Sequence, residues 1–274
     1  MTKLSIVIPT MNGREKMLQE LYASIHGDHE IIIERDHGGP SQPLSLAEKR
    51  NLGYQRSKGE FILFIDDDNI LEKGSIPHAL RIIRQYKNIG IVGFIGCYST
   101  DKEVICDSGS YRGPMLGFTY DFYVNKTLDK MCKDERNDFY PVDEVANAFL
   151  VRRKVFEEVG LFDANNFPMD LDEADLCFRA RKAGYQVVMS TSSIVYHNSI
   201  TYSRIPKFRR KINAYNMAKN RIIFHKKHKI GLLFLPFFIA LYSVVILFGE
   251  KPKFIYHFLR GVKHGLFNPV KNPT

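Results

Sequence analysis

The segment GEFILFIDDDN, residues 59–69, places three consecutive carboxylates directly after a run of five apolar residues. The apolar run at 61–65 does not alternate with polar residues, which is typical of a strand buried on both faces of a parallel sheet. Carboxylates within such a strand would repel one another and lose hydration. We therefore expect them at its carboxyl end, where open α/β sheets form their ligand crevices.

The three carboxylates predict a metal site. In extended chain, side chains two residues apart point to the same side, so Asp66 and Asp68 can share one cation while Asp67 points elsewhere. Ligands that are all oxygen favour Mg²⁺ or Mn²⁺ over zinc. The alternative is an Asp-rich turn that closes the strand, because these side chains hydrogen-bond to nearby backbone.

Strand and helix patterns alternate on both sides of this segment. Strands are expected at residues 4–8, 30–33, 61–65 and 89–95, and helices at residues 14–25, 45–59 and from 75 onward. A capping box of Ser45 and Glu48 marks the start of the second helix. Units of this length predict an α/β fold with a doubly wound, mostly parallel sheet.

The middle of the chain is less regular. Residues 97–141 lose clear periodicity and are rich in Gly, Asp and Tyr, so we expect hairpins and loops there rather than a new domain. Regular patterns then return, with strands expected at 145–151, 186–189 and 194–196 and helices at 154–159 and 172–183. The last of these helices begins with acidic residues, ends with basic ones and precedes Gly184, as helix termini prefer.

Charge is distributed unevenly along the chain. The total is +9, but residues 1–175 hold 21 basic and 29 acidic side chains, a balance of −8, whereas residues 176–274 hold 18 and 1, a balance of +17. Such a basic segment favours a polyanionic partner, either nucleic acid or an anionic membrane.

The four cysteines have no paired spacing, which predicts reduced thiols in a cytosolic protein without a zinc cluster. The apolar run at the amino terminus is too short for a secretory signal.

The chain changes character after Pro206. Residues 207–229 predict a basic helix, and residues 230–249 contain no charge. That length can cross a bilayer, but a single span would put the bases that follow on the side opposite the basic helix. We therefore favour a re-entrant or in-plane hairpin, in which Pro236 helps the bend and residues 254–266 form a second, amphipathic piece. The alternative is a helix that covers the soluble core or a dimer interface, so a homo-oligomer stays an option.

Five segments carry a resemblance to a known family. They are SIVIPTMN (5–12), RNLGYQRSKGEFILFIDDDN (50–69), NAFLVRRKVFEEVGLFD (147–163), DLDEADLCFRARKAGYQV (170–187) and VYHN (195–198). In these segments the chain resembles the family 2 glycosyltransferases, which have the A-type nucleotide-sugar fold. A further likeness, in YNMAKNRIIFHKKH (215–228) and LRGVKHGL (259–266), is to the tails of members that decorate lipid-linked or cell-surface glycans. We accordingly expect a catalytic domain at 1–203 and a membrane-associated appendage at 204–274.

The resemblance implies a metal-dependent transfer from a nucleoside diphosphate sugar. A metal held by Asp66 and Asp68 would act as a Lewis acid on the departing diphosphate. The match at VYHN adds His197 as a ligand, and a nitrogen ligand favours Mn²⁺ somewhat over Mg²⁺. Without the resemblance, a lone His after a strand is more often a structural hydrogen-bonding residue.

The resemblance also implies a catalytic base in an acidic pair that opens a helix. The acceptor hydroxyl must lose its proton as it attacks, so one carboxylate should face the anomeric carbon. The pair here is Asp172 and Glu173, the reverse of the usual Glu–Asp order. We expect Glu173 to be the base, with Asp172 second and Asp175 as the structural acid of the helix start. Plain helix-dipole acids would explain one of these three carboxylates.

Nucleotide contacts are implied at the ends of the first strands. Family members usually carry two acids and a glycine after the second strand, whereas this chain has RDHG at 35–38. The expected donor-binding residues are Pro9, Thr10, Asp36, Arg50, Asp66 and Asp67. Processive relatives carry a Gln and an Arg-Trp pair after the acidic helix, and this chain has no tryptophan. We therefore expect the addition of a single sugar or a few.

The residues and the resemblance together predict an inverting glycosyltransferase at the cytoplasmic face of the membrane, held there by anionic lipid through residues 204–274 and acting on a lipid-linked or glycan acceptor. A sugar-phosphate nucleotidyltransferase is a second reading, but it would carry a Gly-rich phosphate loop after the first strand. An inactive membrane-bound scaffold of the same fold is a third, opposed by the intact acids. Nucleic acid is a less expected partner, because an uncharged stretch adjoins the basic helix.

Overall fold

The computed structural model describes residues 4–36, 44–113, 119–198, 207–248 and 254–272. They form two compact units. The first comprises Met1–Tyr111, Asp121–Phe162 and Glu173–Ser199, and the second comprises Arg112–Tyr120, Asp163–Asp172 and Ile200–Thr274. The boundary expected at residue 203 lies outside the described residues and stays a prediction. Two short segments of the expected catalytic domain group with the carboxyl-terminal helices.

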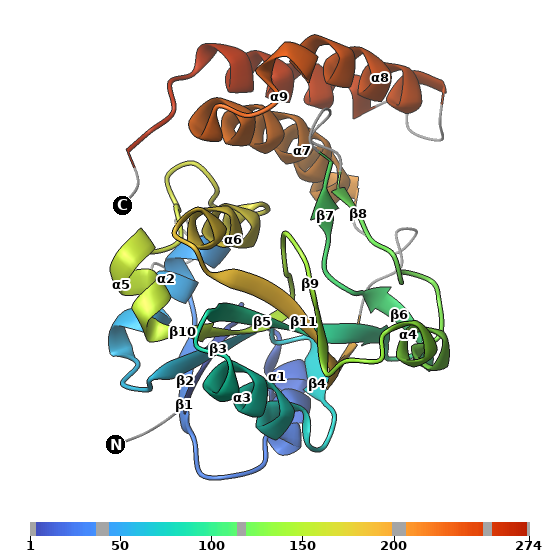
Figure 1. The fold of residues 1–274 in the computed structure, drawn as a ribbon. Helices are drawn as coiled ribbons and strands as arrows, with labels where there is room; N and C mark the ends of the chain where they lie inside the picture. Colours follow the sequence, from blue (N-terminus) through green and yellow to red (C-terminus); the bar gives the residue numbers. More distant parts are fainter. Residues whose placement is uncertain (1–3, 37–43, 114–118, 199–206, 249–253, 273–274) are drawn as a thin grey trace. The chain divides into compact units, whose positions relative to one another are not determined.

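The first unit is built on one mixed sheet with helices on both faces (Figure 1). Its strands are β1 (Leu4–Pro9), β2 (Glu30–Glu34), β3 (Phe61–Ile65), β4 (Asn69–Leu71), β5 (Ile89–Tyr98), β6 (Asp101–Asp107), β9 (Phe139–Pro141), β10 (Ala148–Arg152) and β11 (Gln186–His197). Its helices are α1 (Glu15–Ser24), α2 (Leu46–Arg56), α3 (Ser75–Gln85), α4 (Leu128–Asp134), α5 (Arg153–Val159) and most of α6 (Asp172–Lys182).

Strand order in the main path of the sheet is β2-β1-β3-β10-β5-β11-β4. Parallel pairing joins β1 to β2, β1 to β3, and β5 to β11. Two strands of this path run in the opposite direction: β10 pairs antiparallel with both β3 and β5, and β4, at the edge, pairs antiparallel with β11. The α/β class and the mostly parallel central sheet predicted from the sequence are confirmed. The reversed β10 was not predicted, since the direction of a strand depends on where its distant neighbours lie.

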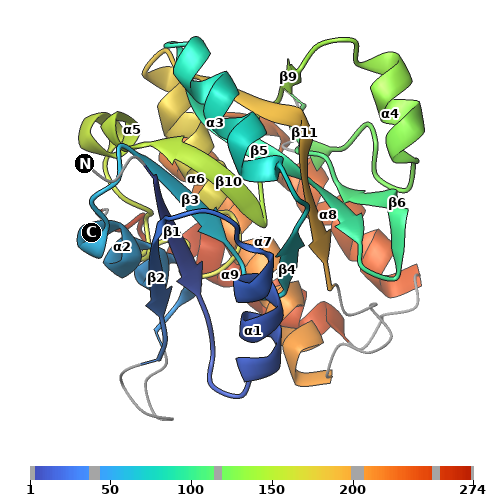
Figure 2. The same ribbon diagram turned by 90° about the horizontal axis from the view of Figure 1, so that it is seen from below.

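Strand β3 is buried over its whole length, as its unbroken apolar run predicts. Its alternate side chains face two different layers. Leu63 and Ile65 join the core beneath α1 and α3, which lie together on one face of the sheet (Figures 1 and 2). On the other face, Phe64 stacks with Phe149 at 5.5 Å between ring centroids and meets Phe162 edge-on at 5.2 Å. The carboxyl end of β3 is thereby held between two packed layers.

Several expected elements differ in extent from those observed. The two strands expected at 186–189 and 194–196 are one continuous strand, β11, with a register shift between Ser190 and Ile194. The second helix ends at Arg56 instead of near residue 59. The irregular stretch after residue 97 contains the β5–β6 hairpin that the sequence indicated, and it adds the short helix α4, which was not expected.

Helix α2 brings two basic side chains to the carboxyl edge of the sheet. The predicted capping box is present: Ser45 Oγ accepts from the Glu48 backbone N–H at 3.2 Å, and Glu48 Oε2 accepts from the Ser45 N–H at 2.7 Å. The helix then approaches β1 closely at Gly53, where an added Cβ would lie 2.2 Å from Val7 Cγ1. This close approach buries Lys49 and Arg50 almost completely.

The described residues of the second unit form the helices α7 (Lys207–His228), α8 (Leu235–Phe248) and α9 (Ile255–Phe267) and the 3₁₀ turn η2 (Leu232–Phe234). A small sheet of β7 (Tyr111–Arg112) and β8 (Thr119–Tyr120) also belongs largely to it. The helices share an apolar core that includes Ile222, Ile246 and Phe258. Among the described residues, no helix combines the length and apolar character needed to cross a membrane.

We expect Gly53→Ala to destabilise the protein by about 1–3 kcal/mol, because the added methyl group must displace β1 or α2. Without a steric clash, alanine would stabilise the helix by about 1 kcal/mol relative to glycine. A loss of stability would therefore show that the clash with β1 outweighs this helix preference. Urea unfolding measures it. Gln55→Ala, at an exposed position of the same helix, is the matched control and should stay within about 0.5 kcal/mol of the wild type. An equal or higher stability of Gly53→Ala would show that α2 does not need this close approach.

Candidate active site

The three carboxylates after β3 lie in a tight turn. The Asn69 N–H donates to the Asp66 carbonyl at 3.2 Å, which closes the turn over residues 66–69. The expectation that Asp66 and Asp68 follow one another in extended chain is therefore wrong, because the chain reverses to begin β4. Each of the three carboxylates meets different partners as a result.

Asp66 faces the interior of the first unit. Its carboxylate Oδ1 accepts a hydrogen bond from Arg50 at 3.0 Å, and its backbone N–H donates to the Asn147 carbonyl at 3.0 Å. Burial raises the pKa of Asp66 to about 6; the Arg50 charge opposes this shift, whereas Glu173 and Asp68 add to it. The negative charges of Glu173 and Asp68 thus disfavour ionisation of Asp66, and the positive charge of one neighbouring cationic side chain favours it.

Arg50 is that cation, and it joins two predicted functional groups. One of its terminal nitrogens contacts Asp66 Oδ1, and the other lies 2.6 Å from Glu173 Oε1. The guanidinium is fully buried and lies 5.5 Å from the centre of the Phe149 ring and 5.7 Å from that of Phe162. Asp66, expected to contact the donor, and Glu173, expected to be the base, therefore contact the same buried guanidinium.

Asp67 has a structural position behind the turn. It is buried, its Oδ2 accepts from Thr10 Oγ1 at 2.6 Å, and its Oδ1 pairs with Arg14. These contacts attach the turn to the end of β1. Arg14, which the sequence analysis did not single out, also lies 3.5 Å from Asp68 Oδ2.

Asp68 and His197 face one another across the sheet edge. His197 ends β11, opposite Asn69 of β4, and its Nε2 lies 3.4 Å from Asp68 Oδ1. Burial would lower the pKa of His197, but Asp68 and the Cys106 thiol raise it to about 10. Burial would raise the pKa of Asp68, but the hydrogen bond and charge of His197, with Arg14, lower it overall. In the absence of metal the two groups form an ion pair.

A carboxylate and an imidazole that already face one another fit a divalent cation as two of its ligands. Among the residues that the structure describes, no three His, Cys, Asp or Glu side chains are arranged to hold an ion by themselves. Asp66, the third predicted ligand, is engaged by Arg50. A metal at this site would therefore take Asp68 and His197 from the protein and need further oxygen ligands, which Mg²⁺ usually obtains from water or from substrate phosphates.

The predicted nucleotide-binding residues at the ends of β1 and β2 are brought together by Lys49. Its ammonium contacts Asp36 Oδ1 at 2.9 Å and donates to the Thr10 carbonyl at 2.9 Å, while the side chain is almost fully buried. Pro9 is the last residue of β1. The residues that follow Asp36 in the RDHG segment, His37 and Gly38, lie outside the described residues. The sequence offers a signal for Lys49, since it precedes Arg50 on the capped helix.

Helix α6 starts with the predicted acids. Asp172 is its first residue and is fully buried, and Glu173, the second, reaches Arg50. Asp175 is held by Arg179 at 2.8 Å one turn later. Arg179 also donates to the carbonyls of residues 159–161, which anchors the chain after α5. Asp175 is thus engaged by Arg179 within its own helix, and its predicted role as the structural acid of the helix start stays a prediction.

The loop that leads into α6 belongs to the second unit and has an unusual backbone. Asp170 and Leu171 both have positive φ, at 71° and 68°, and such a value is uncommon for a bulky residue such as Leu. Asn220 of α7 is buried and donates to the carbonyls of Met169 at 2.8 Å and Asp170 at 2.9 Å. Sequence reasoning missed this role of Asn220, although the residue lies in the tail segment YNMAKN.

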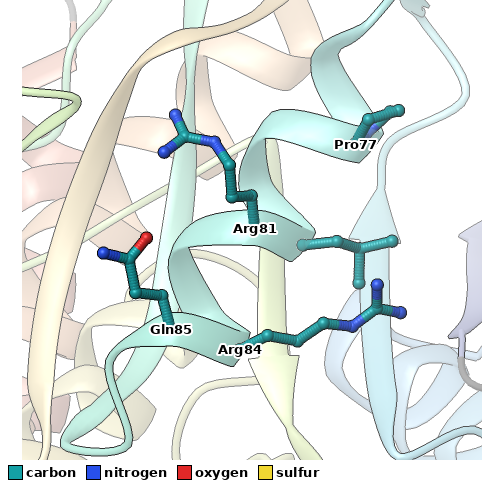
Figure 3. A pocket seen from close by; sticks show the side chains of 5 residues that line it. Pro77, Arg81, Arg84 and Gln85 are labelled. Carbon is teal, nitrogen blue, oxygen red and sulfur yellow. The ribbon is translucent and has the colours of Figure 1, made fainter.

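A separate groove lies on the outer face of α3 (Figure 3). All of its lining residues come from that helix: Pro77, Leu80, Arg81, Arg84 and Gln85. None of them is a predicted site residue, and a single helix face offers few convergent polar groups. We assign no role to this groove.

In the metal-free protein, we expect the Asp68–His197 pair to make stability depend on pH. The pKa of His197 is about 10 in the folded state against 6.5 ordinarily, so the pair stabilises the fold fully below about pH 6.5 and loses this effect as pH rises through about 10. Urea unfolding with a chelator, at pH values across this window, measures the slope. His197→Gln should flatten it. An unchanged slope in that variant would show that the pair does not couple to folding.

Comparisons with known proteins identify the family. A model described as glycosyltransferase like family 2 matches residues 4–221. An uncharacterized Sinorhizobium fredii protein, y4gI, is 21% identical over 202 residues, which is 71% of this chain and 22% of that protein. An uncharacterized glycosyltransferase of Haemophilus influenzae is 28% identical over 109 residues, 32% of this chain and 37% of that protein. The Staphylococcus aureus poly(ribitol-phosphate) β-N-acetylglucosaminyltransferase TarP is 23% identical over 130 residues, 38% of this chain and 40% of that protein. The chain thus spans about a fifth to two fifths of the length of these relatives.

Two solved structures share the fold. One is GalNAc-T7 with UDP, GalNAc and Mn²⁺, with a TM-score of 0.56 at 13% identity over 90% of this chain and 57% of that one. The other is the mannosyltransferase PcManGT of Pyrobaculum calidifontis with GDP-Man and Mn²⁺, with a TM-score of 0.56 at 12% identity over 97% of this chain and 87% of that one. The family model covers most of the chain, including the turn after β3 and the start of α6. The chain therefore belongs to the glycosyltransferase-like family 2, and it has the A-type glycosyltransferase fold.

Proposed function

We propose that this protein is an inverting, metal-dependent glycosyltransferase. It moves a single sugar from a nucleoside diphosphate sugar to a lipid-linked or glycan acceptor at the cytoplasmic face of the membrane. The observation that carries the proposal is the bridge from Asp66 through Arg50 to Glu173. A transferase needs a site for the donor next to a base for the acceptor, and this bridge places the two predicted groups around one guanidinium.

Similar proteins support the kind of donor and acceptor. Both solved structures of the same fold contain Mn²⁺ with a nucleotide or a nucleotide sugar. TarP is named for transfer to a poly(ribitol-phosphate) acceptor, which is a polymer with sugar-alcohol hydroxyls. The tail at 204–274, with its basic and apolar residues, supports an acceptor presented at an anionic membrane surface.

The reaction requires three things of the chain. The donor must be held, and the residues for its nucleoside part are Thr10 and Asp36, which follow β1 and β2, and Lys49 of α2. Asp68 and His197 would hold Mn²⁺ or Mg²⁺. When bound, the metal supplies Lewis-acid stabilisation of the departing diphosphate. The acceptor hydroxyl must then be deprotonated, which is the role of Glu173.

Bond changes in this reaction balance without any further reactant. The acceptor oxygen forms a bond to the anomeric carbon, the bond from that carbon to the diphosphate breaks, and the hydroxyl proton passes to Glu173. Arg50 keeps the Glu173 carboxylate oriented, because one of its terminal nitrogens lies 2.6 Å from Glu173 Oε1.

We expect one nucleoside diphosphate to stabilise the protein in a metal-dependent manner. Purified protein is heated with UDP, GDP, dTDP or CMP, each with and without Mn²⁺. A ligand that binds only the folded state adds about 2.7 kcal/mol at a hundredfold excess over its dissociation constant. Asp68→Asn should lose the metal-dependent part, whereas Asp129→Asn, at an exposed position of α4, should keep it. If no nucleotide stabilises the wild type, the proposed donor class is wrong.

Glu173→Gln should abolish turnover and leave donor binding intact. The amide can still contact Arg50, but it cannot accept the proton, and the loss of a general base costs about 10²- to 10⁴-fold in rate. The assay is release of the nucleoside diphosphate from the matching donor in the presence of membrane acceptor. Glu157→Gln, on the exposed face of α5, is the control and should retain full rate. Substantial turnover by Glu173→Gln would pass the role of base to Asp172.

A further inference from the structure

Helix α8 exposes an apolar face that its own fold does not use. The exposed side chains of η2 and α8 include Leu233, Phe237, Leu241, Val244 and Phe248, and their spacing of three or four residues puts them on one side of the helix. Leu233 is 92% exposed, Phe237 55% and Phe248 86%. A helix that is apolar all round is normally buried, so half of this one requires a covering partner.

The opposite face of α8 is already occupied within the second unit. Leu235, Phe238 and Ile246 are buried, and Leu235 and Ile246 belong to the core that α8 shares with α7 and α9. Tyr242 stacks on Phe258 of α9 with 6.3 Å between ring centroids. Figure 1 shows α8 and α9 side by side. The exposed stripe is therefore additional to the apolar surface that holds these helices together.

The exposed face of α9 has a different character. Tyr256, Leu259 and Phe267 are exposed together with Arg260 and Lys263. Aromatic and aliphatic residues interspersed with basic ones are typical of helices that lie in the interface of a membrane, where the cations reach the lipid phosphates. No carboxylate occurs in residues 176–249, and Glu250 is the only one in residues 176–274. The charge of this region thus complements an anionic surface.

The dimensions of α8 fit a helix in the membrane plane. Its 14 residues extend about 21 Å at 1.5 Å per residue, against a hydrocarbon core of about 30 Å. None of the described helices can cross a membrane. A helix of this length can bury its exposed side at the boundary of headgroups and acyl chains while its other side stays packed on protein.

We propose that the exposed face of α8, together with the exposed Arg260 and Lys263 of α9, is the surface by which this protein lies in an anionic lipid bilayer. Phe237, Leu241 and Val244 insert at the boundary of headgroups and acyl chains, and Arg260 and Lys263 contact the lipid phosphates. This inference extends the proposed function, because it names the residues that would hold the enzyme beside a lipid-linked acceptor. A second copy of the chain is a poorer occupant, since pairing two such faces would bring together two segments of charge +17.

The absence of tryptophan from the chain provides a direct test. Phe237→Trp places one fluorophore on the proposed face, and Tyr22→Trp places one at an exposed position of α1 as the control. Each full-chain variant is mixed with vesicles of phosphatidylcholine and anionic phosphatidylglycerol whose acyl chains carry bromine. We expect a blue shift and quenching for Phe237→Trp and neither for Tyr22→Trp. Equal responses of the two variants, or binding without quenching at Phe237, would overturn the proposal.

A second set of variants tests whether the face is needed for binding. Phe237→Glu, Leu241→Glu and Val244→Glu together should lower the vesicle partition coefficient at least about a hundredfold, because each of these apolar side chains contributes on insertion. The control combines Gln19→Glu, Tyr22→Glu and Gln85→Glu, which gives the same change in charge on α1 and α3. Equal losses in both sets would leave only a general charge effect and refute the assigned face.

Two further measurements separate this inference from its rivals. A concentration-dependent dimer in sedimentation, abolished by the α8 variants while vesicle binding persists, would assign the face to self-association and overturn the proposal. Thermal stabilisation by nucleotide with Mn²⁺ is measured on the same α8 variants and should be unchanged. Lost vesicle binding with retained nucleotide binding supports the membrane face. If the wild type binds vesicles but no nucleotide stabilises it, the proposed function is refuted and the membrane face is not.

Discussion

A buried guanidinium flanked by two carboxylates is the interaction on which the candidate site depends. Arg50 has no exposed surface, and it contacts Asp66 on one side and Glu173 on the other. Taking such charges out of water is costly, and removal of one partner would leave the others uncompensated. An arginine suits this position because its planar, forked donors reach two acids at once and its face packs on aromatic rings. Phe149 and Phe162 provide those rings.

The arrangement also explains why the sheet matters to the chemistry. Asp66 directly follows β3, Arg50 comes from the helix that precedes β3, and Phe149 lies on the inserted strand β10. The guanidinium is therefore placed by three elements whose mutual positions are set by strand pairing. The Asn147 carbonyl, just before β10, holds the Asp66 N–H as well. These few contacts fix the positions of Asp66 and Glu173 relative to the sheet.

Local patterns in the sequence were enough to predict most of the longer strands and helices, whereas the short elements β4, β9 and α4 were not predicted. The run at 61–65 indicated a buried strand, and Ser45 with Glu48 indicated a helix start, because both signals depend on near neighbours. Contacts between segments that are distant in the sequence could not be predicted from local patterns. The reversal of β10, the continuity of β11 and the contact of Lys49 with Asp36 depend on which distant segments meet.

The turn at residues 66–69 was predicted in part from local composition, but its partners depend on distant segments. Its composition fitted both a metal-binding edge and an Asp-rich turn, and the chain does form a turn there. That geometry directs Asp66 to Arg50 and Asp68 to His197, so the two acids serve different neighbours. The resemblance to the family singled out Glu173 and His197 as candidate site residues, which composition alone would not have distinguished from the other acids and histidines, and these roles stay predictions.

The strained loop before α6 has a consequence for how the chain can be divided. Asn220 holds the carbonyls of Met169 and Asp170, Lys227 lies 2.6 Å from the buried Asp163, and Asn166 donates to the Lys271 carbonyl. These three anchors all come from the carboxyl-terminal helices and the segment after them. A gene cut after codon 203 would therefore produce a chain whose entry into α6 lacks every one of these ties. The segment at 163–172 packs as part of the carboxyl-terminal unit, so a truncated chain would leave it without these partners.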